Sequence, residues 1–148
     1  MTLHLRPARV TDLPGVLIGE QDYIRRWEPD HELTWRLQLE RHLRCWTDNF
    51  DRLTVAEWDG NFAGYALWMA EGEWAVLCTL NVAEAFRRKG IGRALVAAFM
   101  TSAKDQGYPH LSLSVRADNP AMRLYERAGF ICTGTDAHQY LTLENHLA

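Results

Sequence analysis

The apolar run WAVLCTLNVA, residues 74–83, does most to limit the folds open to this chain. It contains no charged side chain, so it predicts a strand that is covered on both faces of a sheet. The next stretch, FRRKGIGRAL at 86–95, brings together three consecutive cations and two glycines, and an apolar helical pattern then continues to Lys104. A buried strand that leads through a glycine loop into a helix indicates an α/β fold, with helices packed on a sheet.

The other elements are predicted from periodicity and turn residues. Asp59-Gly60-Asn61 is a strong hairpin signal, and Pro7, Gly107 and Gly129 are typical ends of elements. The order predicts a mixed α+β arrangement with a mostly antiparallel start and a strand-helix-strand crossover in the second half. We expect strands at 3–8, 52–58, 62–70, 74–83, 110–115, 130–135 and 138–144, and helices at 11–27, 33–50, 90–104 and 120–128.

Size and charge exclude several classes of protein. A chain of 148 residues is expected to form one domain, here over residues 1–148. Its net charge of −3 argues against a nucleic-acid partner, which usually requires a basic surface. The apolar runs are too short to span a bilayer, so no membrane partner is expected. The N-terminus shows no signal-peptide pattern, and the three cysteines are isolated and odd in number, which favours a reducing, cytoplasmic setting.

The glycine loop predicts a phosphate site. The first turn of a helix carries backbone N–H groups without internal partners, and glycines let a ligand approach them closely. The loop is no Walker A motif, because no Gly-Lys-Ser/Thr follows, and Leu95 stands where a dinucleotide fingerprint has its third glycine. A nucleotide-binding module of another kind is therefore disfavoured. The glycines alone leave open a solvated basic turn that happens to precede a helix.

A second motif decides between these interpretations. NPAMRLYERAGF, residues 119–130, places Asn119 before a short helix, Tyr125 inside it and Gly129 at its end. Together with Arg87-x-x-Gly90-x-Gly92, it resembles the GNAT superfamily of acyl-CoA-dependent N-acyltransferases. The element order agrees over essentially the whole chain. The resemblance implies a central, mostly antiparallel mixed sheet in which the parallel strands at 74–83 and 110–115 splay apart, flanked by helices.

The resemblance also implies acetyl-CoA as the acyl donor, with its pyrophosphate on the glycine loop. The pantetheine arm would run along the strand as an added strand, with a bulge at Asn81 or its neighbours, and Asn119 would contact the cofactor and cap its helix. No metal is expected, because the histidines show no ligand spacing. The cofactor-binding residues implied are Leu80, Asn81, Val82, Arg87, Arg88, Lys89, Gly90, Ile91, Gly92, Arg93, Ala94, Asn119 and Tyr125.

By the same resemblance, Tyr125 is the general acid that protonates the leaving thiolate, and the amine attacks the thioester directly. The N–H of Val82 would meet the oxyanion. Many relatives place an acidic base on the central strand, but Cys78 and Thr79 stand there, and Cys78 is expected to be inert core. No base is assigned. The candidates are Glu20, Asp22, Glu28, Glu71, Glu73 and His138.

In this fold the first helices form one wall of the acceptor site. Residues 19–35 are rich in aromatic and acidic side chains, which suits a cationic amine, although Arg25 and Arg26 could meet a carboxylate instead. A polyamine, an aminoglycoside, an amino acid and a peptide amine all stay open as acceptors. The pocket residues expected are Tyr23, Trp27, Glu28 and Trp35, with Trp68 and Trp74 as further contributors.

Two further expectations follow. Because no base is evident, the alternative to an N-acetyltransferase is an acyl-CoA-binding sensor or regulatory module without turnover. We also expect a homodimer, since relatives often pair through their C-terminal strands and the aliphatic YLTL at 140–143 would make an adhesive sheet edge.

Overall fold

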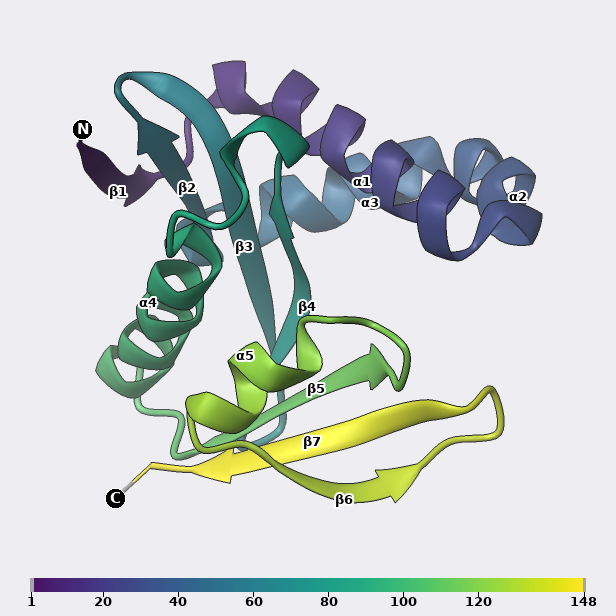
Figure 1. Ribbon diagram of the computed structural model, residues 1–148, viewed down its shortest axis with the longest axis vertical. Coiled ribbons are helices and arrows are strands. Elements are labelled where there is room, and N and C mark those ends of the chain that lie inside the picture. The colour runs from purple at the N-terminus through teal and green to yellow at the C-terminus, as the bar shows by residue number, and fades with distance from the viewer. Residues whose placement is uncertain (1, 148) are drawn as a thin grey trace.

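A computed structural model describes residues 2–147, and its strands form one seven-stranded sheet in the order β1-β2-β3-β4-β5-β7-β6 (Figure 1). All neighbours pair antiparallel except β4 and β5, which are parallel. This is the mixed α/β sheet that the sequence predicts. The strands are β1 Leu3–Pro7, β2 Leu53–Trp58, β3 Asn61–Glu71, β4 Trp74–Val82, β5 His110–Arg116, β6 Ile131–Thr135 and β7 Tyr140–His146; the helices are α1 Leu13–Trp27, α2 Glu32–Leu37, α3 Leu39–Asp48, α4 Ile91–Asp105 and α5 Met122–Arg127.

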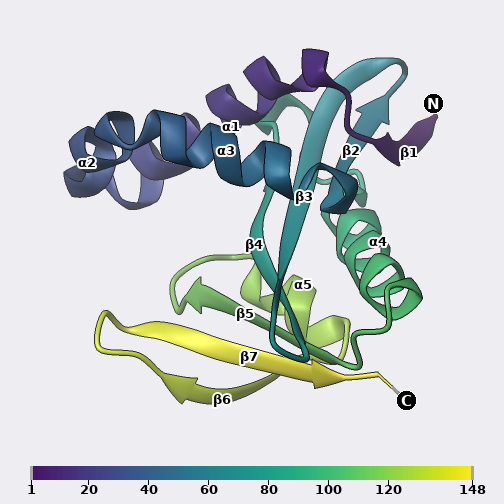
Figure 2. The ribbon, with the colours of Figure 1, turned by 180° about the vertical axis from the view of Figure 1, so that it is seen from behind.

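Helices cover both faces of the first half of the sheet (Figures 1 and 2). Successive side chains of a strand point to opposite faces, and β3 shows this alternation in its buried residues. Tyr65 and Leu67 pack with Val16 of α1 and Trp46 of α3, while Ala66 and Trp68 pack with the α4 side. The sheet therefore has two apolar cores, and β3 contributes to both.

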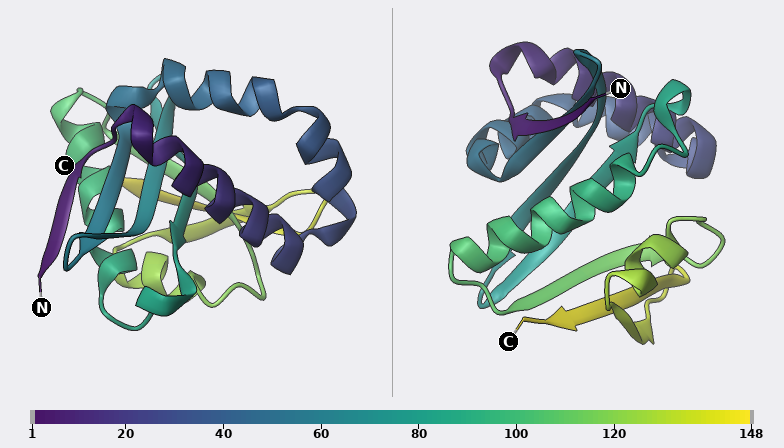
Figure 3. Two further views of the ribbon diagram at one scale, coloured as in Figure 1. Left: turned by 90° about the horizontal axis from the view of Figure 1, so that it is seen from above. Right: turned by 60° about the vertical axis from the view of Figure 1, so that its left-hand side comes forward.

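The parallel pair of strands separates part-way along its length. β4 and β5 pair from Trp74 and His110 as far as Leu77 and Leu113, and beyond this point no register joins them. Figures 1 and 3 show the two halves of the sheet, β1–β4 and β5–β7–β6, opening away from each other. The splayed pair implied by the family resemblance is confirmed.

The bulge lies three residues before the position expected at Asn81. In the β3–β4 ladder Leu67 pairs with Thr79 and Trp68 with Leu77, so Cys78 is the extra residue. A bulge bends its strand and increases the local twist. Its place directly after the last β4–β5 pair explains why the two strands part there.

The predicted helix at 33–50 is two helices, α2 and α3, which meet at Gln38 in a non-helical conformation. The core-facing residues Leu43 and Trp46 lie on α3, whereas Leu33 and Leu37 of α2 are exposed. A straight helix over the whole range would run for about 27 Å and carry one end away from the sheet. The break lets α3 return along the sheet after α2.

The last strand is not an edge, which corrects one expectation. β7 lies between β5 and β6 and pairs with both, so β6 forms the edge of the sheet. After α5 the chain forms the outer strand β6 first and the inner strand β7 last. The 140–143 segment is thus covered and cannot be the adhesive edge on which a dimer was expected.

An ion pair near the N-terminus fixes the start of α1. Nη1 and Nη2 of Arg6 on β1 donate to the two carboxylate oxygens of Asp12 at 2.7 and 2.8 Å, and the Arg9 N–H donates to the same carboxylate at 2.7 Å. These hydrogen bonds lower the pKa of Asp12 below its ordinary value. Since Asp12 directly precedes α1, the pair ties the helix to the sheet.

Candidate active site

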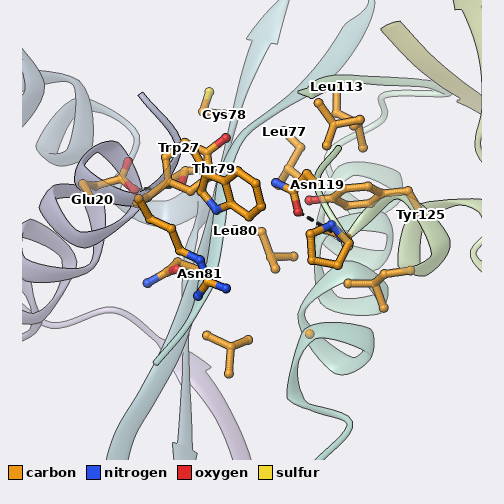
Figure 4. Close-up of a pocket in the computed structure, with 18 of the residues that line it drawn as sticks. Glu20, Trp27, Leu77, Cys78, Thr79, Leu80, Asn81, Leu113, Asn119 and Tyr125 are labelled. Carbon is orange, nitrogen blue, oxygen red and sulfur yellow. Dashed lines mark hydrogen bonds between the residues drawn. The ribbon is translucent and has the colours of Figure 1, made fainter. Parts of the chain in front are cut away.

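A cavity of about 930 Å³ opens where β4 and β5 part. It extends from the loop before α4 to the C-terminal half of α1 (Figure 4). Its walls come from α1, α2, α3, β4, residues 86–92, β5, residues 119–127 and the start of β7. Residues that are far apart in the chain therefore share one space.

One end of the cavity is a helix N-terminus. Gly90 adopts a φ of +79°, a backbone conformation that residues with a Cβ atom rarely adopt. Helix α4 begins directly after it. The hydrogen bonding of this turn begins with the Ala94 N–H, which donates to the Gly90 carbonyl at 3.2 Å. The earlier N–H groups have no carbonyl one turn before them in the helix, so they can bind an anion. A Cβ at Gly90 would meet nothing within 4 Å, so the loop surface there is open to a ligand.

The loop is fixed to the strand before it. Nε of Arg87 donates to the Val82 carbonyl at 3.0 Å, and Arg87 and Arg88 line the cavity. Lys89 lies elsewhere, with its ammonium 5.2 Å from the centre of the Trp58 ring. Of the predicted cofactor-binding residues, Lys89, Arg93 and Ala94 are not part of the cavity wall formed by the described residues. The others line the cavity: Leu80, Asn81, Val82, Arg87, Arg88, Gly90, Ile91, Gly92, Asn119 and Tyr125.

The middle of the cavity is the free side of β4. The Ala83 N–H donates to the Ala63 carbonyl at 2.8 Å, and bonded and non-bonded pairs alternate along an antiparallel ladder. Leu80 and Val82 therefore direct their N–H and C=O groups away from β3, toward the side that β5 has left. An extended ligand can pair with these groups as a strand would.

Tyr125 enters the cavity from α5 (Figure 4). Its side chain is 6% exposed and contacts the Phe130 ring edge-on at a centroid distance of 6.1 Å. Burial, with a smaller effect from Tyr23, raises its pKa well above that of a free tyrosine. The phenol therefore keeps its proton at neutral pH and is available as a donor. Before the helix, Oδ1 of Asn119 accepts the Ala121 N–H at 2.9 Å, so Asn119 stabilises the turn that leads into α5, whose own N-cap is Ala121.

Glu20 enters from α1 on the opposite side (Figure 4). Its Oε2 accepts hydrogen bonds from the Tyr65 hydroxyl at 2.8 Å and the Thr79 hydroxyl at 2.9 Å. Burial raises the pKa of Glu20 above its ordinary value, against the smaller opposing effect of these two hydrogen bonds. The preceding Gly19 permits this approach, since a Cβ there would lie 2.6 Å from the Tyr65 hydroxyl.

Comparisons with known proteins agree with this geometry. The model of the acetyltransferase (GNAT) family matches residues 20–130. The chain belongs to this family. The solved structure of a ribosomal-protein-alanine N-acetyltransferase from Brucella melitensis is 27% identical, with a TM-score of 0.80 over 97% of this chain and 99% of that one. A PaiA N-acetyltransferase from Thermoplasma acidophilum, solved in complex with coenzyme A, is 18% identical with a TM-score of 0.82 over 99% of both chains, and shares the fold.

A curated relative matches part of the chain. A mycothiol acetyltransferase from Clavibacter sepedonicus is 34% identical over 92 residues, which are 62% of this chain. The matched region is 30% of that protein's length, so this GNAT chain corresponds to less than a third of the relative.

Glu20 and Glu28 are the carboxylates in the cavity wall formed by the described residues of this GNAT domain. The other candidate bases lie elsewhere: Glu71 and Glu73 are exposed at the β3–β4 turn, Asp22 is exposed on α1, and His138 lies between β6 and β7. Thr79, one of the two positions at which the family resemblance led us to expect an acid, donates to the carboxylate of Glu20 instead. The sequence could not single out Glu20, because Tyr65 and Thr79 lie 45 and 59 residues away.

The far end of the cavity, which we call the acceptor end, is aromatic. It is lined by the four predicted pocket residues Tyr23, Trp27, Glu28 and Trp35. Tyr140 also lines it and was not predicted. Trp35 stacks on His42 at a centroid distance of 5.6 Å, and the Arg26 guanidinium lies 5.5 Å from the Trp27 ring. Arg25 pairs instead with Glu32 at 3.0 Å. Tyr140 had no local motif to mark it, because only the strand order brings β7 to this place.

Three further expectations are corrected. Trp68 is 1% exposed and part of the core, so it does not reach the acceptor end. Trp74 packs against His110 and His146 at the other end of β4. Cys78 is not core: its side chain is accessible at the cavity wall, because the bulge turns it there. Partial burial nevertheless raises the pKa of this thiol to about 12, so little thiolate forms at neutral pH.

Residues 2–147 contain neither a membrane-spanning helix nor a cluster of metal ligands. None of the helices described is long and apolar enough to cross a membrane. No three His, Cys, Asp or Glu side chains within that range are arranged so that they could hold a metal ion.

Proposed function

We propose that this GNAT domain transfers an acetyl group from acetyl-CoA to the primary amine of a small molecule or peptide. One observation carries the proposal: a single cavity joins an anion-binding helix N-terminus, a free strand edge, a buried tyrosine and a buried carboxylate. Each of these four features matches one requirement of acetyl transfer from a thioester. The similar proteins are named as acetyltransferases, which supports the same reaction.

The residues present fit acetyl-CoA. The N–H groups at the start of α4, with Arg87 and Arg88 beside them, would hold the pyrophosphate. The main-chain groups of Leu80 would pair with the pantetheine arm, and the Val82 carbonyl, which already accepts from Arg87, could accept a second hydrogen bond from it. Acetyl-CoA would supply the thioester, and the chain would hold it between Glu20 and Tyr125.

The chemistry needs one base and one acid. Glu20 would take a proton from the ammonium form of the acceptor, directly or through a water, and the free amine would attack the thioester carbonyl. As the C–N bond forms and the C–S bond breaks, the Val82 N–H would stabilise the oxyanion, and Tyr125 would give its proton to the leaving thiolate. The attacking nitrogen would lose its second proton to water, and the Tyr125 phenolate would take a proton back from water, which leaves a neutral amide, CoA thiol and the original tyrosine. A thiol has a pKa of roughly 8.5, so the leaving group needs only modest assistance. No covalent enzyme intermediate is required.

The alternative, an acyl-CoA sensor without turnover, was favoured by the lack of a base. Glu20 supplies a carboxylate of raised pKa inside the cavity, which supports an enzyme instead.

A calorimetric titration with acetyl-CoA, run beside ATP and NAD, tests the donor. Selective binding of acetyl-CoA followed by CoA release with at least one primary amine would support the proposal. Selective binding without release across a broad amine panel would favour the sensor. The absence of acetyl-CoA binding would overturn both.

A further inference from the structure

A hydrogen bond joins the two halves of the molecule across the acceptor end. The Tyr140 hydroxyl, at the start of β7, donates to Oε1 of Glu28, the residue that ends α1. The partners are 112 residues apart in the chain, and both line the cavity. They stand on the two walls that separate beyond Leu77 and Leu113. We call this contact the Glu28–Tyr140 bridge.

Both partners are held by their own surroundings. The Glu28 N–H donates to the Ile24 carbonyl at 2.8 Å, which keeps it in register with the last turn of α1. The Tyr140 N–H donates to Oδ1 of Asp136 at 2.9 Å, and the Asp136 N–H donates to the Tyr140 carbonyl at 2.9 Å. Because both backbones are fixed before the side chains meet, the bridge is a consequence of the fold rather than a chance surface contact.

The groups around the bridge keep its donor protonated. Oε1 of Glu28 also lies 3.8 Å from the His31 ring, and Arg116, paired with Asp118 at 3.0 Å, stands beside Tyr140. Burial and the neighbouring carboxylate raise the pKa of Tyr140, so its phenol stays a neutral donor. A neutral hydroxyl that donates to a carboxylate makes a stronger hydrogen bond than two neutral groups do.

The bridge forms part of the wall around the acceptor end, in the same cavity as Glu20. A polypeptide that binds in extended form needs an open groove or sheet edge along which its chain can continue. Here the acceptor end is bounded by the bridge and by the rings of Tyr23, Trp27 and Trp35. A small amine fits in such a space as a whole. The rest of a peptide chain, in contrast, would have to pass out of the cavity at the place where the bridge stands.

We propose that the Glu28–Tyr140 bridge is a specificity determinant that restricts the acceptor to small free amines and excludes polypeptide amines. This inference rests on the proposed function, since it concerns the acceptor of the same reaction.

The test compares two classes of acceptor by CoA release. The small class is a short aliphatic diamine, a free amino acid and an amino sugar; the large class is peptides with a free α-amino group or a lysine side chain. We expect kcat/KM for the best small amine to exceed that for the best peptide by at least about tenfold, the scale on which pocket shape discriminates. Tyr140→Phe, which removes the donor, should raise the peptide-to-small ratio by about tenfold, and Tyr140→Ala should raise it further.

A double-mutant cycle tests the contact itself. Glu28→Ala should raise the same ratio, and Tyr140→Phe should add little in the Glu28→Ala background, because the two changes remove one interaction. Tyr108→Phe and Glu40→Ala are matched controls on residues outside the cavity wall, and they should leave the ratio unchanged. Circular dichroism and melting temperature establish that each variant is folded.

Three results would overturn the inference. A wild-type protein that uses peptides as well as small amines would contradict it alone, as would a ratio that is unchanged in Tyr140→Phe, Tyr140→Ala and Glu28→Ala. No CoA release with any acceptor of either class would reject the proposed function and this inference with it. The first two outcomes include turnover and the third does not, so they are distinguishable.

Discussion

Glu20 is held by opposing physical effects that set its proton affinity. Two hydroxyl donors, at 2.8 and 2.9 Å, stabilise the carboxylate, but burial destabilises it by more, and its pKa is raised as a result. A base is most effective when its pKa lies near the working pH. The environment of Glu20 therefore moves an ordinary carboxylate toward the range in which it can take a proton from an ammonium.

Replacing Glu20 by glutamine tests this role. Glu20→Gln keeps the shape and an acceptor oxygen but cannot take a proton, so kcat/KM should fall by about 10²–10⁴-fold near neutral pH. In the wild type, kcat/KM should fall as the pH drops through the raised pKa of Glu20, and the variant should lack this limb. A CoA-release assay over a pH series measures both. An unchanged profile in Glu20→Gln would show that another group is the base.

The same substitution should affect stability in the opposite direction. Because the pKa of Glu20 is raised on folding, its contribution to the free energy of unfolding is full below its unfolded pKa and is lost as the pH rises through the folded pKa. Glutamine does not ionise, so Glu20→Gln removes this loss of stability at higher pH. Melting temperatures should thus be similar at about pH 4 and higher for the variant at about pH 8. A variant that melts lower than the wild type at the higher pH would contradict the assignment of burial as the dominant effect.

Tyr125→Phe isolates the proton that the phenol carries. The ring and its contact with Phe130 stay, while the hydroxyl is lost. Turnover should drop by about 10²-fold or more, and the affinity for acetyl-CoA should stay close to that of the wild type. Steady-state kinetics and calorimetry on the same preparation separate the two quantities. Intact turnover would remove Tyr125 as the acid.

At the scale of elements, α1 is the part that brings Glu20, the proposed base, to the sheet. Its approach depends on Gly19, where a Cβ would lie 2.6 Å from the Tyr65 hydroxyl and 2.8 Å from Nδ2 of Asn81. The helix start is tied to β1 by the Arg6–Asp12 pair, so α1 cannot easily move away as a rigid rod. Glu20 is therefore placed by the packing distance between a helix and two strands.

Gly19→Ala should push α1 outward and displace Glu20. We expect turnover to fall by about tenfold or more and the melting temperature to drop, since overpacking costs about 1–3 kcal/mol. Binding of acetyl-CoA should change little, because its expected contacts lie on β4 and the loop before α4. Ile18→Ala, at the neighbouring position that is 59% exposed, is the control and should leave turnover unchanged. Equal losses in the two variants would indicate a general effect on α1.

At the scale of the whole molecule, the sheet ends at β6 rather than at β7. Its outer strand is exposed along all five residues, with Ile131 67% exposed. An uncharged exposed edge is a natural place for strands of another copy to pair. The homodimer expected from the sequence remains a prediction, and β6 is now the edge on which it would depend.

Light scattering measures this directly. The expected mass is twice the 17.0 kDa of the chain, and Ile131→Lys should shift it toward the monomer, because a charge at an edge opposes strand pairing. A monomeric mass for the wild type at micromolar concentration would reject the dimer. A dimer that persists in Ile131→Lys would place its interface elsewhere.

Local patterns in the sequence determined most of the elements and the donor side of the site. The apolar run at 74–83 and the Gly90–Gly92 turn act over a few residues, so periodicity and turn chemistry were sufficient to predict a strand, a loop and a helix N-terminus in this order. Tyr125 and Asn119, which line the cavity, could be predicted as site residues for a similar reason, because their motif is continuous in the chain.

Only the tertiary structure decided the rest. Glu20 meets Tyr65 and Thr79 across 45 and 59 residues, and Glu28 meets Tyr140 across 112. Such contacts follow from strand order, from a bulge at Cys78 and from the close packing of α1, none of which has a local pattern. The physical reason is one of range: backbone preferences act between near neighbours in the chain, whereas the burial that raises the pKa of Glu20 depends on every segment that packs around it.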